Sequence, residues 1–163
     1  MAQMGRRWSP ASTNVDSELI GIARTWLARD TAGSWFRRDR AMLGRAAGGA
    51  VQLASAAEML LIGEGIETTL AGIEVTGLPG WAALSTPGMV ALILPPAVRE
   101  VVILADNDHN GAGERAAYTA ADRWLGEGRR VRIAIPPKPG TDFADVLLGL
   151  SYARITEARN VAA

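Results

Sequence analysis

Short apolar runs separated by glycine and proline recur along the last two thirds of the chain. Such runs, rich in Val, Ile and Leu and bounded by turn residues, predict the buried strands of a parallel sheet. Between them the apolar residues recur at helical spacing, which predicts a helix after each strand. The expected strands cover 59–62, 81–84, 101–105 and 131–135, and the expected helices cover 66–75, 86–94, 111–126 and 142–150. This alternation predicts an α/β fold with a four-stranded parallel sheet flanked by helices.

The second expected helix carries start and stop signals. Thr86 precedes Pro87, and Pro95-Pro96 follow the apolar positions. Thr is favoured at the N-cap and proline at the first helical position. The sequence therefore predicts Thr86 as the N-cap of this helix.

The first third of the chain is less regular. Residues 18–29 fit both a helical stripe and one face of a strand. A turn at 30–34 followed by Trp35-Phe36 favours a hairpin, and 50–53 is a short strand candidate. Residues 1–17 are expected to be a flexible lead-in, or to begin at a cut within a longer protein.

Composition restricts the classes of function. The chain has 163 residues, 48% of them apolar and 21% charged, which is typical of a globular domain. It lacks cysteine, so disulfides and thiolate metal sites are excluded. No apolar run reaches the roughly 20 residues of a membrane span, and no signal-peptide order is present, so we expect a cytoplasmic protein without a membrane partner. The 17 basic and 17 acidic residues balance, so any nucleic-acid contact must use a local patch or a partner.

Carboxylates follow three of the four expected strands. Glu64 comes after the first, Asp106 and Asp108 after the third, and Asp142 after the fourth, with Asp145 three residues further on. Parallel strands end at one edge of the sheet, so these groups are expected to converge. Converging carboxylates repel one another, which raises their pKa values or requires a cation. Mg²⁺ and Mn²⁺ suit such all-oxygen sites. The ligand we expect there is a phosphate bound to the metal ion, because the ion neutralises the phosphate charge.

The same acids also fit a structural interpretation as helix caps and turn formers, because the Asp side chain readily accepts hydrogen bonds from nearby backbone N–H groups. For Asp142 and Asp145 both interpretations stay open. For Glu64 the cap interpretation is weaker, because Glu is not a favoured N-cap and Gly65 removes bulk where a ligand would approach.

Three segments resemble the three motifs of the Toprim domain: GEGIETTLA at 63–71, VVILADNDHNGAGERAA at 101–117 and PPKPGTDFADVLL at 136–148. This catalytic fold is shared by bacterial and phage primases, type IA and type II topoisomerases and certain nucleases. The likeness is closest to the primase-like branch of phages, plasmids and mobile elements, in which a segment like RAMLGRAAGGAVQL at 40–53 precedes the glutamate motif. It covers residues 19–150.

The resemblance implies a Toprim-type four-stranded parallel sheet with a small N-terminal β-rich appendage, and it favours a strand at 18–29. The implied division is a lead-in at 1–17, a small β-rich subdomain at 18–56, a Toprim catalytic domain at 57–150 and a C-terminal tail at 151–163.

The resemblance also implies roles for the acids. Glu64 would be a general acid/base or a metal ligand, and Asp106 and Asp108 would be the metal-binding aspartate pair. Asp142 and Asp145 match the third acidic motif. The implied catalytic residues are Glu64, Asp106 and Asp108, and the implied metal, Mg²⁺ or Mn²⁺, would be held by these three together with Asp142 and Asp145.

The implied activity is Mg²⁺-dependent nucleotidyl or phosphoryl transfer on nucleic acid. Its specific form is DNA primase-like primer synthesis within a larger replication protein, with single-stranded DNA and nucleoside triphosphates as partners and a helicase or other domains as further ones. One alternative is metal-dependent nuclease or topoisomerase-like cleavage, although Tyr118 and Tyr152 lack a recognisable nucleophile context. The other is a nucleic-acid-binding module without turnover.

Basic residues supply candidate nucleic-acid contacts. Arg37, Arg38 and Arg40 follow Trp35-Phe36, a combination suited to phosphate contacts and base stacking. A solvated hairpin face is the alternative. Lys138, one loop before the third acidic motif, is a further candidate for a phosphate contact.

His109 beside the aspartate pair fits a proton shuttle or an exposed loop residue. Trp81 and Trp124 are expected in the core.

Overall fold

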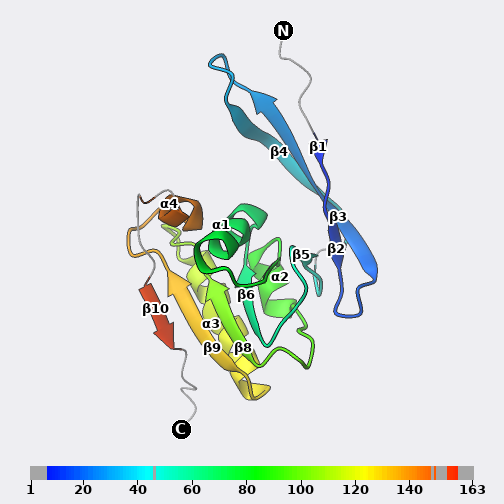
Figure 1. Ribbon diagram of the computed structural model, residues 1–163, viewed down its shortest axis with the longest axis vertical. Helices are drawn as coiled ribbons and strands as arrows, with labels where there is room; N and C mark the ends of the chain where they lie inside the picture. Colours follow the sequence, from blue (N-terminus) through cyan, green and yellow to red (C-terminus); the bar gives the residue numbers. More distant parts are fainter. Residues whose placement is uncertain (1–6, 46, 148, 150–153, 158–163) are drawn as a thin grey trace.

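The computed structural model describes residues 7–45, 47–147, 149 and 154–157. Its larger sheet has the strand order β10-β9-β8-β6-β7-β5 (Figure 1). Four neighbouring strands are parallel, as predicted. They are β6 (Met59–Gly63), β7 (Gly80–Ala82), β8 (Glu100–Leu104) and β9 (Arg130–Ile135).

Each edge of this parallel sheet carries one further, antiparallel strand. β5 (Val51–Gln52) pairs with β7, and β10 (Arg154–Glu157) pairs with β9. The strand expected at 50–53 therefore belongs to the larger sheet.

Helices cover both faces of the larger sheet, because successive strand residues point to opposite faces. The helices are α1 (Ile66–Thr76), α2 (Thr86–Ala91), α3 (Ala112–Gly126) and α4 (Phe143–Leu147). One face packs Leu60, Ile62, Val101, Ile103, Val131 and Ile133 against Met89 of α2 and Ala117, Ala120 and Trp124 of α3. The other face packs Leu61, Val102, Leu104 and Ala134 against Ala71 of α1 and Phe143 of α4. Trp81 and Trp124 are almost completely buried, as predicted for core residues. No helix in the described ranges is long and apolar enough to cross a membrane.

The predicted cap of α2 is wrong by one residue. Ser85 is the N-cap, and its Oγ accepts a hydrogen bond of 3.0 Å from the Gly88 N–H. Thr86 and Pro87 are the first two helical residues. Ser and Thr are both good caps, so the sequence alone did not decide between adjacent candidates.

The N-terminal part forms a smaller antiparallel sheet. β1 (Arg7–Trp8) and β2 (Ala11–Thr13) pair with one edge of β3 (Leu19–Arg29), and β4 (Trp35–Gly44) pairs with the other edge. The strand interpretation of 18–29 is therefore confirmed. β3 and β4 make a long hairpin that projects away from the larger sheet in Figure 1.

The hairpin turn follows from local hydrogen bonding. Asp30 Oδ1 accepts hydrogen bonds from the N–H groups of Ala32 and Ser34, and Gly33 adopts a positive φ of 86°. Asp is favoured in turns for this bonding, and glycine for this backbone conformation.

Contacts from β2 and from the hairpin hold the smaller sheet against the larger one. Thr13 forms an isolated antiparallel bridge with Ala50. Ala23 of β3 and Met42 of β4 pack in one cluster with Ile66 of α1 and Ala82 of β7. These contacts place one face of the hairpin towards the start of α1.

Candidate active site

The loops after β6, β8 and β9 bring four of the candidate acids into electrostatic contact. Burial is the main cause that raises the pKa of Asp106 from 3.8 to about 6, and the nearby charges of Asp142, Glu64 and Asp108 raise it further. Burial and the charge of Asp108 also raise the pKa of Glu64, while Arg40 opposes the shift. The cluster is therefore partly desolvated and crowded with like charges, a combination common at functional sites.

Asp106 is half-buried immediately after β8, and its carboxylate is oriented by Thr68 of α1. The Thr68 hydroxyl donates to Asp106 Oδ1 over 3.1 Å, which lowers the pKa of Asp106 against the effect of burial. Thr68 itself is only 5% exposed. Thr68 is a positioning residue that the acidic motifs alone do not reveal. Its signal is its position four residues after Glu64, one helical turn further along.

Asn107 ties the aspartate loop to the loop after β9. Its Nδ2 donates to the Pro136 carbonyl over 2.7 Å, and its own carbonyl accepts from the Gly140 N–H over 2.7 Å. Its N–H donates to the Thr141 carbonyl over 3.3 Å. These bonds hold Asp106 near Asp142, so Asn107 is a second positioning residue that the sequence analysis missed.

Asp108 is exposed and also anchors the start of α3. Its Oδ2 accepts from the Gly113 N–H over 3.2 Å. A Cβ at position 113 would lie 2.9 Å from the Asp106 carbonyl oxygen and 3.2 Å from Asp108 Oδ2, so the glycine permits this close approach. The capping interpretation therefore accounts for one oxygen of Asp108.

Asp142 and Asp145 cap α4 reciprocally. Asp142 Oδ1 accepts from the N–H groups of Ala144 and Asp145 over 2.8 and 3.1 Å. Asp145 Oδ2 accepts from the Asp142 N–H over 3.2 Å, which completes the pattern of a capping box. The structural interpretation thus applies to both residues, and the charge of Asp142 still acts on Asp106.

The chemistry of this donor set fits a hard divalent cation, because every candidate ligand is a carboxylate oxygen. Within the described ranges, no group of three or more His, Asp and Glu side chains is arranged to hold a metal ion. Mg²⁺ commonly takes one or two carboxylates and keeps several waters. Asp106 and Asp108 supply two carboxylates at this edge, and the charge of Asp108 acts on the pKa of Asp106.

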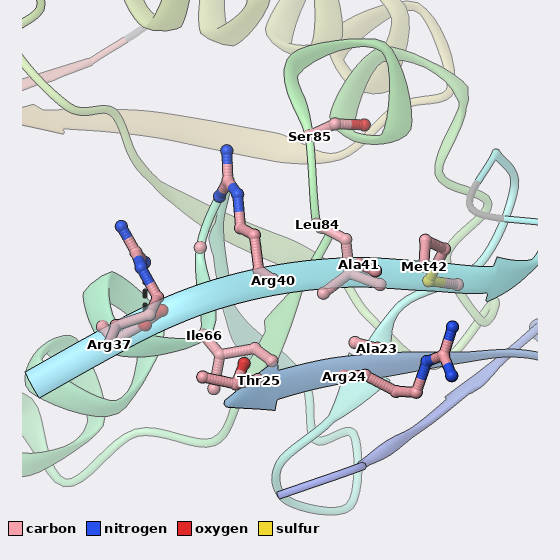
Figure 2. Close-up of a pocket in the computed structure, with 12 residues that line it drawn as sticks. Ala23, Arg24, Thr25, Arg37, Arg40, Ala41, Met42, Ile66, Leu84 and Ser85 are labelled. Carbon is pink, nitrogen blue, oxygen red and sulfur yellow. Dashed lines mark hydrogen bonds and ion pairs between the residues drawn. The ribbon is translucent and has the colours of Figure 1, made fainter. Parts of the chain in front are cut away.

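Next to the carboxylates lies a pocket of about 300 Å³ between the hairpin and the starts of α1 and α2 (Figure 2). Arg37 and Arg40 line its hairpin side, and Gly65 and Ser85 line the opposite side. Gly65 is the N-cap of α1 and makes no side-chain cap bond. A Cβ there would approach other atoms only to 3.8 Å, so the chain's own packing leaves room at this position.

Arg37 bridges the hairpin and α1. Its Nη1 lies 2.9 Å from Glu67 Oε1, and the side chains are 49% and 56% exposed. Arg40 acts on the pKa of Glu64. Arg38 is exposed at the β-bulge, where it has no Cα partner on β3. The structure therefore brings Arg37 and Arg40 to the pocket, while Arg38 does not line it.

Lys138 and His109 lie in exposed loops beside the cluster. The Lys138 carbonyl accepts two hydrogen bonds from Thr141. His109 packs on Gly140, where a Cβ would come within 2.7 Å of the imidazole Cε1. Gly140 also has a φ of 78°, so this position requires glycine for conformation and for space.

Residues 59–150 match the family model described as the Toprim domain. This chain belongs to the Toprim domain family. The Toprim-type fold implied by the three motifs is thereby confirmed. The assignment of the carboxylates after β6, β8 and β9 to the acids of those motifs stays a prediction. The branch of phages and mobile elements stays a prediction.

Solved structures share this fold. A DNA primase domain from Pseudomonas aeruginosa has 17% identity and a TM-score of 0.55, with 89% of this chain and 47% of that chain covered. The DnaG catalytic core has 20% identity and a TM-score of 0.55, with 89% and 49% covered. The zinc-binding and RNA polymerase domains of the Aquifex aeolicus primase have 19% identity and a TM-score of 0.55, with 91% and 41% covered. This Toprim chain therefore spans less than half the length of these structures. No curated protein matches it.

Proposed function

We propose that this Toprim chain carries out Mg²⁺-dependent nucleotidyl transfer on nucleic acid, in the form of primase-like primer synthesis within a larger replication protein. The observation that carries the proposal is the coupled carboxylate cluster beside an arginine-lined pocket. Acids alone repel phosphate, whereas acids that hold a cation next to arginines suit a polyphosphate.

The chain's own residues have distinct roles in this proposal. Asp106 and Asp108 would hold the cation, and Thr68 fixes the orientation of the Asp106 carboxylate. A bound divalent cation would neutralise charge on the transferred phosphoryl group. Arg40 and Arg37 would bind phosphate oxygens at the pocket.

Glu64 is the candidate general acid/base: burial and the charge of Asp108 raise its pKa above the ordinary value, and a higher pKa makes the carboxylate a stronger proton acceptor. Asp142 contributes charge to the cluster, and Asp145 contributes to the cap of α4. A metal-ligand role for these two residues, and a phosphate contact for Lys138, remain proposals.

Fold similarity to a primase domain and to the DnaG core supports the nucleotidyl-transfer form over nuclease or topoisomerase-like cleavage. Tyr118 is exposed on α3, and Tyr152 lies outside the described residues. Single-stranded DNA and nucleoside triphosphates are the proposed substrates. A helicase or another domain of a longer protein is the proposed partner.

The test is incubation of the chain with Mg²⁺ or Mn²⁺, single-stranded DNA and labelled nucleoside triphosphates, in parallel with Asp106→Asn and Asp122→Asn. Asp122 is exposed on α3 and serves as the matched control. We expect labelled oligomers from the wild type and the control and a loss of at least 100-fold in Asp106→Asn, which removes charge from a metal ligand.

Shortened DNA in place of oligomers would favour the nuclease. Absence of Mn²⁺ binding in calorimetry would contradict both enzymatic forms and leave a binding module.

A further inference from the structure

We propose that one face of the β3–β4 hairpin is a binding track for single-stranded nucleic acid. The track consists of Trp8, Arg29, Trp35, Arg37 and Arg40. The proposal deepens the proposed function, since it names the surface that would guide a template strand to the pocket. Only this guiding role rests on the proposed function. Binding itself is independent of catalysis.

Strand register places all five side chains on one face. Directly paired residues of neighbouring strands point to the same side of a sheet, and alternate residues of one strand do so too. On β3 the alternate residues are 25, 27 and 29. Thr25 pairs with both Trp8 and Arg40, Leu27 pairs with Arg37, and Arg29 pairs with Trp35. Successive rows of the track are two residues, or about 7 Å, apart along β3.

The track carries cationic charge without an acid in its own strands. Asp39 is the only acid in β3 and β4, both of which are fully described, and it pairs with Trp26 on the opposite face. Glu67 of α1 contacts the track through Arg37. That ion pair is about half exposed, and such pairs are weak enough for a phosphate to displace.

The track's aromatic rings are accessible. Trp8 is 42% exposed and Trp35 is 44% exposed, whereas Trp81 and Trp124 are buried in the core. The Arg29 guanidinium lies 4.7 Å from the centre of the Trp35 ring. Exposed rings interleaved with cations match how single strands are bound, by stacking of bases and by contacts to phosphates.

The same face of the hairpin leads to the candidate active site. At its base, Ala23 and Met42 pack beside Ile66, the first residue of α1. Arg37 and Arg40 project from the same side of β4 at the pocket (Figure 2). A strand bound along the track would therefore run from the hairpin turn towards Gly65. This continuity and the charge complementarity favour nucleic acid over a protein partner.

The test is fluorescence anisotropy of labelled dT20 with the full chain, without added metal, and with rU20 and a duplex as competitors. Trp35→Ala is compared with Phe36→Ala, because Phe36 is the adjacent residue, is 47% exposed and lies on the opposite face. We expect Trp35→Ala to weaken dT20 binding about tenfold and Phe36→Ala to leave it unchanged. Trp35→Phe retains an aromatic ring and should recover part of the loss.

A second pair of variants tests the cations. Arg29→Gln should make the slope of log affinity against log salt about 0.7 less steep, the value for one lost phosphate contact on a single strand. Arg7→Gln is the control, because Arg7 is exposed and pairs with Trp26 on the opposite face. The competitors distinguish DNA from RNA, since stronger competition by rU20 than by unlabelled dT20 would identify RNA as the preferred occupant.

Three outcomes overturn the track: no binding of dT20 by the wild type, equal losses in Trp35→Ala and Phe36→Ala, or equal competition by the duplex. Circular dichroism and Mn²⁺ affinity report whether Trp35→Ala stays folded. Primer synthesis lost in Asp106→Asn, with dT20 binding unaffected by Trp35→Ala, contradicts the track alone. Track-dependent binding without any metal affinity contradicts the proposed function alone.

Discussion

At the scale of single residues, Asp106 is the most perturbed group of the site. Burial and three neighbouring carboxylates oppose its ionisation, and the Thr68 hydroxyl favours it. At neutral pH, above this pKa, Asp106 is therefore mostly ionised, although its surroundings in the metal-free chain disfavour the charged form. In the proposed cation site a bound ion would offset this repulsion, whereas in the metal-free chain the repulsion lowers the free energy of unfolding.

Replacement of Asp106 by Asn should stabilise the metal-free chain at pH 8. The folded pKa of about 6 lies above the ordinary 3.8. The folded state therefore binds more protons than the unfolded state between these values, and the free energy of unfolding falls as pH rises through this window. We expect Asp106→Asn to raise it by about 1–3 kcal/mol at pH 8 and by much less at pH 4. Urea denaturation at both pH values measures the difference, and an equal effect at both would contradict the raised pKa.

The Thr68 hydroxyl should control metal affinity through Asp106. Thr68→Val keeps the shape of this buried side chain and removes the donor to Asp106 Oδ1. Removal of such an outer hydrogen bond commonly lowers metal affinity about 10–100-fold, so we expect a loss in that range for Mn²⁺. Thr68→Ser keeps the hydroxyl and should bind Mn²⁺ nearly as the wild type does. Electron paramagnetic resonance of free Mn²⁺ measures this, and equal affinity in all three chains would exclude a positioning role.

At the scale of secondary-structure elements, the four parallel strands and the helices that follow them were predictable, because apolar periodicity is a local property of the sequence. The placement of Glu64 and Asp106 at one edge was predictable for the same reason. The ties made by Asn107 and Thr68 were not, because each joins segments that become neighbours only after folding. At the start of α4 the sequence left two interpretations open, because an Asp can serve both as a helix cap and as a metal ligand.

Asp142 can be tested for these two roles separately. Asn is as good an N-cap as Asp, so Asp142→Asn should keep the hydrogen bonds to Ala144 and Asp145 while it removes the charge. Asp142→Ala removes both and should lower the free energy of unfolding by about 1 kcal/mol. A metal-ligand role requires Mn²⁺ affinity to fall in both variants. Affinity that falls only in the alanine variant would assign Asp142 to the cap alone.

At the scale of the whole molecule, a chain with balanced charge still separates its charges in space. The carboxylates gather at the ends of the parallel strands, and the exposed arginines of β4 lie on the hairpin above them. The net charge of the whole sequence does not show this separation, whereas the strand register shows which charged side chains share a face of the hairpin. Arg37 of the hairpin contacts Glu67 of α1, so this ion pair joins the proposed binding track to the proposed catalytic unit.

Replacement of Glu67 by Gln should strengthen dT20 binding, because it releases Arg37 and removes a negative charge beside the track. We expect affinity to rise about threefold at low salt and the salt dependence to steepen by up to 0.7, the value for one added phosphate contact. Because the ion pair is exposed, the free energy of unfolding should change by less than about 1 kcal/mol. Glu74→Gln on the same helix changes net charge equally and is the matched control, since Glu74 is exposed and lies two turns further along α1. Anisotropy titrations at several salt concentrations measure both variants. Equal strengthening by the two would show that net charge alone acts, and weaker binding by Glu67→Gln would mean that the ion pair holds Arg37 in its binding position.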